Sequence, residues 1–280
     1  ARKALAALRE KVVQARPDVL VVFGDDQLEC FDYNNMPAFA VYAGARFSGY
    51  DTKAFLPRTR QSEPFVEPQA QIPGHPELAM GLVRGLLKRG FDPSYCLDMP
   101  RPDSGMGHAF MRPAEWLGAY TTPVVPVLFN CFFAPQPSAT RCHQLGRAVR
   151  EIIEEFPQDL RVAVVGSGGL WHTPGQDRPY IDAEFDGQML ERLKVGNARG
   201  MAEYFDSYRI PEGDISQDTS KPGRFSNGVQ GDGGPQGGTR EHCTWVAAAS
   251  VCEGRPWTVL DYVPIYTAPI GLGFAYCAAP

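Results

Sequence analysis

The chain has 280 residues, of which 44% are hydrophobic and 21% are charged, a composition typical of a soluble globular protein. The net charge is -5 and no cluster of Lys and Arg occurs, which argues against a nucleic-acid partner because phosphates are neutralised by clustered cations. No apolar run reaches the roughly 20 residues that cross a bilayer, and the first residues lack a signal-peptide pattern. We therefore expect a cytoplasmic protein that acts on a small molecule and needs no membrane. Its length favours one domain over residues 1–280, or one domain with a long insertion.

Helical and strand patterns alternate along the chain, beginning with a helix over residues 3–15 and a buried strand over 19–23. In chain order the same patterns predict a helix over 77–89, a strand over 124–129, a helix over 142–156, a strand over 161–165, helices over 187–204 and 241–252, and a strand over 257–266. Strands that alternate with helices favour an α/β fold with a mostly parallel central sheet flanked by helices. Residues 213–238 are rich in Gly and have no period, so we expect a long loop over the surface or over a site.

Two polar segments directly follow predicted strands. Residues 24–27, with the sequence GDDQ, follow the first strand, and residues 166–172, with the sequence GSGGLWH, follow the strand over 161–165. Because ligands bind beyond the carboxyl ends of parallel strands, we expect both segments to face one cleft. Taken singly, each segment could equally be an ordinary polar or glycine-rich turn.

Other motifs narrow the chemistry. Ser167 does not lie in a G-x-S-x-G elbow, and neither GxGxxG nor GxxxxGK[ST] follows a strand, so serine hydrolysis and nucleotide binding are not supported. His108 lies in a predicted loop with several Gly and Pro residues, where a lone histidine is more often solvated than functional. Glu241 opens the helix predicted over 241–252, where a carboxylate also favours the helix dipole.

Several segments occur together in an order and spacing that match a known superfamily. They are PDVLVVFGDDQLECFDYNNMPAFAVY, GHAF, PVVPVLFNCFFAPQPSATRCHQLGRAVREIIEEF, VAVVGSGGLWHTPG, GGTREHCTWVAAASV and VLDYVPIYTAPIGLGFAY. The chain resembles the class III extradiol ring-cleavage dioxygenase superfamily, of the LigB-like type found in the protocatechuate 4,5-dioxygenase β-subunit. The resemblance spans nearly the whole chain.

The resemblance implies an Fe(II) site of two histidines and one glutamate, with a catechol-, protocatechuate- or gallate-like substrate and dioxygen as reactants. Such a facial arrangement leaves open positions for both reactants. Glu241 matches the carboxylate ligand. His172 matches a histidine that acts as acid and base, for which an imidazole titrating near neutrality is suited, and His108 matches one that contacts substrate or oxygen.

The iron site departs from the superfamily pattern in two ways. Gln27 stands where a histidine ligand is expected, and a glutamine carbonyl is a neutral, weaker donor. The other histidine belongs to a first strand upstream of Ala1, and we expect an N-terminal segment that supplies this strand, since the sheet would otherwise expose apolar surface. We also predict that Asp26 and Arg178 contact substrate, with a surface position as the alternative for Arg178.

Three hypotheses about activity follow. The leading one is an Fe(II)-dependent extradiol dioxygenase. The second is a diverged relative whose Gln27 site holds another metal or performs another reaction, and the third is a metal-free binding or partner subunit. The resemblance also implies a homo-oligomer or a hetero-oligomer with a small subunit.

Overall fold

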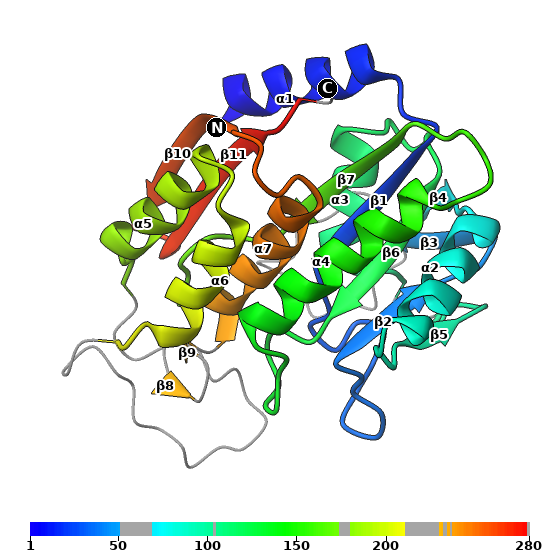
Figure 1. Ribbon diagram of the computed structural model, residues 1–280, viewed down its shortest axis with the longest axis horizontal. Helices are drawn as coiled ribbons and strands as arrows, with labels where there is room; N and C mark the ends of the chain where they lie inside the picture. Colours follow the sequence, from blue (N-terminus) through cyan, green and yellow to red (C-terminus); the bar gives the residue numbers. More distant parts are fainter. Residues whose placement is uncertain are drawn as a thin grey trace, which may run out of the picture.

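A computed structural model describes residues 1–50, 69–102, 105–173, 180–210, 230–231, 234–235 and 237–278. Its centre is a five-stranded sheet with the strand order β5-β2-β6-β1-β7 (Figure 1). The strands are β1 (Val19–Asp25), β2 (Phe39–Tyr42), β5 (Ser94–Cys96), β6 (Val124–Phe129) and β7 (Val162–Ser167). Neighbouring strands pair in parallel except β2 with β6, which pair antiparallel. The predicted α/β fold with a mostly parallel sheet is confirmed.

Helices cover both faces of this sheet (Figure 1). On one face lie α2 (Pro76–Lys88), α4 (Ala139–Glu154) and α7 (His242–Val251), and on the other lies α3 (His108–Trp116). Along β1, alternate residues enter two separate cores, with Val21 in one and Val22 in the other. Burial of both faces explains why β1 and β6 are continuous apolar runs rather than alternating ones.

Smaller elements surround the sheet. They are α1 (Arg2–Ala15), α5 (Ala183–Lys194), α6 (Ala198–Ser207), the 3-10 helix η3 (Gly237–Glu241), and the pairs β3 (Arg46–Tyr50) with β4 (Gln69–Pro73), β8 (Gln230–Gly231) with β9 (Gly234–Pro235), and β10 (Thr258–Ile265) with β11 (Ile270–Tyr276). Helix α1 packs along the hairpin β10–β11. No helix in the described part of the chain is both long and apolar enough to cross a bilayer.

The structure corrects two predicted elements. The helix predicted over 187–204 is two helices, α5 and α6, because Gly196 takes a left-handed φ of 72° and Asn197 caps α6 by accepting from Gly200 N at 2.7 Å. His108 opens helix α3 rather than lying in a loop, and Pro113 lies within that helix. Most of the loop predicted over 213–238 lies outside the described residues.

Helices α4 and α7 approach each other closely at Gly146. A Cβ added at Gly146 would collide with the carbonyl oxygen of Ala247 and lie 2.8 Å from Ser250 Cβ. We expect Gly146→Ala to lower the free energy of unfolding by about 1–3 kcal/mol, because the backbone of α7 must move.

A glycine in an open part of a helix gives the matched control. Gly187 lies within α5 and nothing lies within 4 Å of the Cβ position, so Gly187→Ala should stabilise the protein by about 0.5–1 kcal/mol. Urea denaturation measures both variants. A Gly146→Ala variant as stable as Gly187→Ala would contradict the packing of α4 on α7.

Candidate active site

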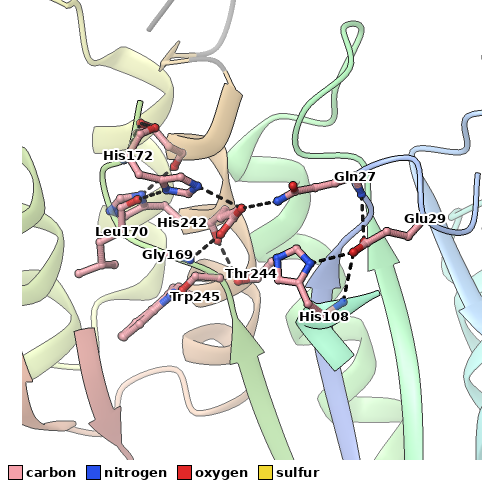
Figure 2. Close-up of polar contacts among 12 residues, drawn as sticks. Gln27, Glu29, His108, Gly169, Leu170, His172, His242, Thr244 and Trp245 are labelled. Atoms are coloured by element: carbon pink, nitrogen blue, oxygen red, sulfur yellow. Dashed lines mark hydrogen bonds and ion pairs between the residues drawn. The ribbon is translucent and has the colours of Figure 1, made fainter. Parts of the chain in front are cut away.

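Three distant segments meet at one carboxylate, that of Glu241 at the end of η3 (Figure 2). Its Oε1 accepts a hydrogen bond from Gln27 Nε2 at 3.4 Å and lies 3.2 Å from His172 Nε2. Its Oε2 accepts from Gly169 N at 2.5 Å. We call Gln27, Gly169, His172 and Glu241 the Glu241 cluster. The loops that follow β1 and β7 therefore do converge, as the sequence predicts.

Glycines allow these segments to come so close. A Cβ at Gly168 would lie 2.7 Å from Glu241 Cβ, and a Cβ at Gly238 would lie 2.5 Å from His172 Cδ2. The indole of Trp245, one turn into α7, donates to Gly168 O at 2.9 Å and holds the glycine segment against the helix. Packing around the Glu241 carboxylate and the His172 ring thus requires glycine at positions 168 and 238.

His172 and Glu241 form a buried ion pair, each with 5% of its surface exposed. His172 Nδ1 donates to Leu170 O at 2.8 Å, which directs Nε2 to Glu241. Burial opposes a charged imidazole, but the Glu241 carboxylate outweighs it and raises the pKa of His172 to about 9. Burial likewise opposes ionisation of Glu241, and His172 holds the pKa of this carboxyl below its usual range. The charge of Glu241 therefore favours the imidazolium of His172 in this pair.

His108 lies at the more open end of this region, with 46% of its side chain exposed. Its Nδ1 lies 2.8 Å from Glu29 Oε1, and the ring stands between Glu29 and the Glu241 cluster (Figure 2). Partial burial opposes charge on this imidazole, but the hydrogen bond and the charge of Glu29 raise the pKa of His108 to about 9.

The two aspartates that precede Gln27 differ in their surroundings. Asp26 is 2% exposed, and its oxygens accept from Cys30 N at 2.8 Å and Phe31 N at 3.0 Å, so it fixes the turn rather than facing a ligand. Asp25 is 1% exposed, and no residue in the described ranges hydrogen-bonds to its Oδ2. Burial, reinforced by the charge of Glu241, raises the pKa of Asp25 well above its usual range. Arg178, the other predicted substrate contact, lies outside the described residues.

Sequence reasoning missed a buried network centred on Asp186. Asp186 Oδ1 accepts from Trp171 N at 2.8 Å and lies 3.1 Å from His242 Nε2, and Oδ2 accepts from Tyr262 OH at 2.6 Å. Trp171 precedes His172 and His242 follows Glu241, so this network ties both segments of the Glu241 cluster to α5 and β10. A signal was present in the sequence, since Asp186 shares helical spacing with the apolar Met189 and Leu190 and so belongs to the buried face of α5.

The side chains around Glu241 match only part of the iron-binding set of two histidines and one glutamate that the resemblance implies. Among the described residues, no group of three His, Cys, Asp or Glu side chains is placed to hold a metal ion. Glu241 matches the carboxylate ligand, but the amide nitrogen of Gln27, a hydrogen-bond donor, faces it. The amide of Gln27 would have to rotate by about 180° before its oxygen could bind a metal ion beside Glu241. The set of two histidines and one glutamate does not assemble from the described side chains.

Comparisons with known proteins place these features in a family. Residues 1–213 match the family described as the catalytic LigB subunit of aromatic ring-opening dioxygenase. A 2,3-dihydroxyphenylpropionate/2,3-dihydroxicinnamic acid 1,2-dioxygenase of Escherichia coli (strain 55989 / EAEC) is 31% identical over 193 residues, which are 68% of this chain and 53% of the relative. The same enzyme from Escherichia coli O139:H28 is 30% identical over 193 residues. The chain spans about half the length of these curated relatives.

A solved structure is also similar. The crystal structure of an uncharacterized protein from Escherichia coli K12 superposes with a TM-score of 0.52 over 97% of this chain and 91% of that one, at 14% sequence identity. At this identity the likeness concerns the fold.

Proposed function

Because the chain belongs to the family of catalytic LigB subunits of aromatic ring-opening dioxygenases, we propose that the protein opens the ring of a small dihydroxylated aromatic compound with dioxygen. The observation that supports this most strongly is the convergence of His172 and Glu241 with the Gln27 turn at the carboxyl ends of β1 and β7. The relatives that act on 2,3-dihydroxyphenylpropionate support a catechol-like substrate. Catechol, protocatechuate and gallate analogues are the first compounds to test.

The proposed reaction balances without a further reductant. The aromatic ring supplies the electrons that reduce dioxygen, one carbon–carbon bond of the ring breaks, and both oxygen atoms remain in the product. This agrees with a sequence that carries no fingerprint for a dinucleotide. Fe(II) is the cofactor that we propose; Glu241 would be its carboxylate ligand, and the ion would supply the redox chemistry that lets a diol react with dioxygen.

The side chains of this chain would then bind, orient and move protons. A diol must lose a hydroxyl proton before cleavage, and a proton must return as the ring opens. His172 is proposed as the group that exchanges this proton, since Leu170 O holds its Nδ1 and directs its Nε2 into the site. A cation held by Glu241 would offset the negative charge that favours the imidazolium, and would leave the imidazole free to take up a proton. His108, at the exposed end, is proposed to contact the substrate as it enters.

Oxygen consumption tests the proposal directly. We expect the purified full-length protein, supplied with Fe(II), to consume one molecule of dioxygen for each dihydroxylated aromatic molecule lost. Removal of metal by a chelator should abolish uptake, and Fe(II) should restore it. Stoichiometric iron without turnover of any aromatic diol would overturn the substrate class.

One observation favours the second hypothesis, a diverged metal site, because the amide of Gln27 stands where the superfamily carries an imidazole. We expect Gln27→His to raise the affinity for Fe(II) by about 10-fold, since imidazole is the better donor for this ion. Metal analysis after dialysis against limiting Fe(II) measures this. Gln188→His, on the exposed side of α5, is the control and should leave iron content unchanged.

The native metal content decides between the hypotheses. Wild-type protein that retains another metal, and gains iron and ring cleavage only as Gln27→His, would show that the native site has diverged. Wild-type protein that binds no metal, consumes no oxygen and melts unchanged with chelator would favour the metal-free subunit.

A further inference from the structure

Glu29 joins the turn that carries Gln27 to the start of helix α3. Its Oε1 lies 2.8 Å from His108 Nδ1 and accepts the backbone N–H of His108 at 3.3 Å. Its Oε2 accepts the backbone N–H of Gln27 at 3.4 Å (Figure 2). The Glu29 carboxylate therefore contacts one side chain and two backbone amides where the Gln27 turn meets the start of α3.

The start of α3 is shaped to receive this carboxylate. Gly107 is the N-cap of α3 and provides no side-chain cap. A Cβ at Gly107 would collide with the Glu29 carboxylate, lying 2.8 Å from its Cδ. The space left by the glycine admits a negative charge at the positive end of the helix, where unpaired N–H groups are available.

Glu29 makes one long contact within its own turn, to Gln27 N at 3.4 Å, and other residues hold that turn. Asp26 already holds that turn through the backbone amides of Cys30 and Phe31. Arg101 adds a hydrogen bond from Nη1 to Leu28 O at 2.7 Å. The Glu29 carboxylate is thus left to act on α3, and its principal side-chain partner is His108.

We propose that Glu29 is a positioning residue for the ring-opening reaction, one that fixes His108 with Nδ1 on the carboxylate and Nε2 directed to the Glu241 cluster. The inference rests on the proposed function and adds a residue to it. When one ring nitrogen of an imidazole is held by a carboxylate, the tautomer and the ring orientation are set, and the other nitrogen presents a defined group to a ligand. Without Glu29 the exposed His108 ring turns about its side-chain bonds.

Steady-state kinetics with oxygen and a catechol test the proposal. We expect Glu29→Ala to lower kcat by about 10- to 100-fold, the loss typical when an orienting partner of a site histidine is removed, with little change in KM. Glu29→Gln should recover much of this loss, because its amide oxygen can still accept from Nδ1–H. Glu151→Ala, at an exposed ion pair on α4, is the control and should leave kcat unchanged.

Measuring Glu29→Ala in a His108→Asn protein distinguishes positioning of His108 by Glu29 from capping of helix α3 by Glu29. If Glu29 acts through His108, Glu29→Ala should cost nothing further in a His108→Asn protein, so the two losses are not additive. A role confined to capping α3 would instead lower activity equally in both backgrounds. Equal losses, or an unchanged kcat in Glu29→Ala, would overturn the proposal.

A measurement on the protein without substrate keeps this inference distinct from the proposed function. Imidazole ¹⁵N NMR should show His108 of the wild type with a protonated, hydrogen-bonded Nδ1, and Glu29→Ala should shift this signal. If no aromatic diol supports oxygen uptake, the proposed function fails while the NMR result still tests the positioning. An identical His108 spectrum in the two proteins would show that Glu29 does not hold the ring.

Discussion

Replacing His172 with glutamine is expected to lower kcat for ring opening by about 10²- to 10⁴-fold, the range associated with loss of a group that transfers a proton. Glutamine can still donate a hydrogen bond towards Glu241, so the ion pair is lost but the donor is kept. It cannot accept and return a proton near neutral pH. Oxygen uptake at saturating substrate measures kcat, and circular dichroism verifies that the fold is retained.

Another histidine–glutamate pair provides the control. His143 on α4 lies 2.7 Å from Glu253, whose side chain is 30% exposed, so His143→Gln perturbs a partly buried histidine–glutamate pair away from the Glu241 cluster. We expect its kcat to match the wild type below the melting temperature. Equal activity losses in His143→Gln and His172→Gln would mean that the His172 effect arises from folding rather than from proton transfer.

Replacing Asp186 with alanine is expected to lower the free energy of unfolding by about 2–5 kcal/mol, because two buried donors each lose their acceptor at a cost of about 1–3 kcal/mol. Asp186 and His242 both have fully buried side chains, and the same carboxylate accepts from Trp171 N and Tyr262 OH. Its removal leaves these donors without their acceptor in an apolar surrounding. Guanidinium denaturation followed by circular dichroism measures the change.

The same helix carries a matched exposed carboxylate. Glu191 on α5 pairs with Lys194 at the surface, and Glu191→Ala should change the free energy of unfolding by no more than about 0.5 kcal/mol. An Asp186→Ala protein as stable as Glu191→Ala would contradict the view that the Asp186 network holds the segments of His172 and Glu241 together.

The parts of the fold that follow from the sequence are those in which local pattern and tertiary burial agree. Strands β1 and β6 are apolar throughout because both faces of the sheet are covered, and their bounds are close to those predicted. Helix α3 could not be recognised, because Gly107 and Pro113 lie at its start and within it. Its stability comes from packing on β1 and β7, which no local pattern reveals.

In the candidate site too, some residues could be predicted from the sequence and others depend on tertiary packing. Gln27 and His172 lie in the segments that follow β1 and β7, so the rule that ligands bind beyond strand ends brings these two together. Glu241 follows no strand but precedes α7, and only the family resemblance associates it with them. Glu29 is recognised only once α3 has been placed, because its partner His108 is distant in sequence. The helical spacing of Asp186 indicates burial, but its partners are set by tertiary packing. The predictions of a single domain over 1–280 and of an oligomer stay predictions.

The fate of dioxygen tests the central claim most directly, that the Glu241 cluster performs aromatic ring opening. The full-length protein is incubated with a catechol under ¹⁸O₂ and the product is analysed by mass spectrometry. Ring opening by a dioxygenase predicts one open-chain product that carries both labelled atoms, and its absence from His172→Gln within the same time. A product with one labelled atom and an intact ring, or unconsumed catechol at full metal occupancy, would contradict the account.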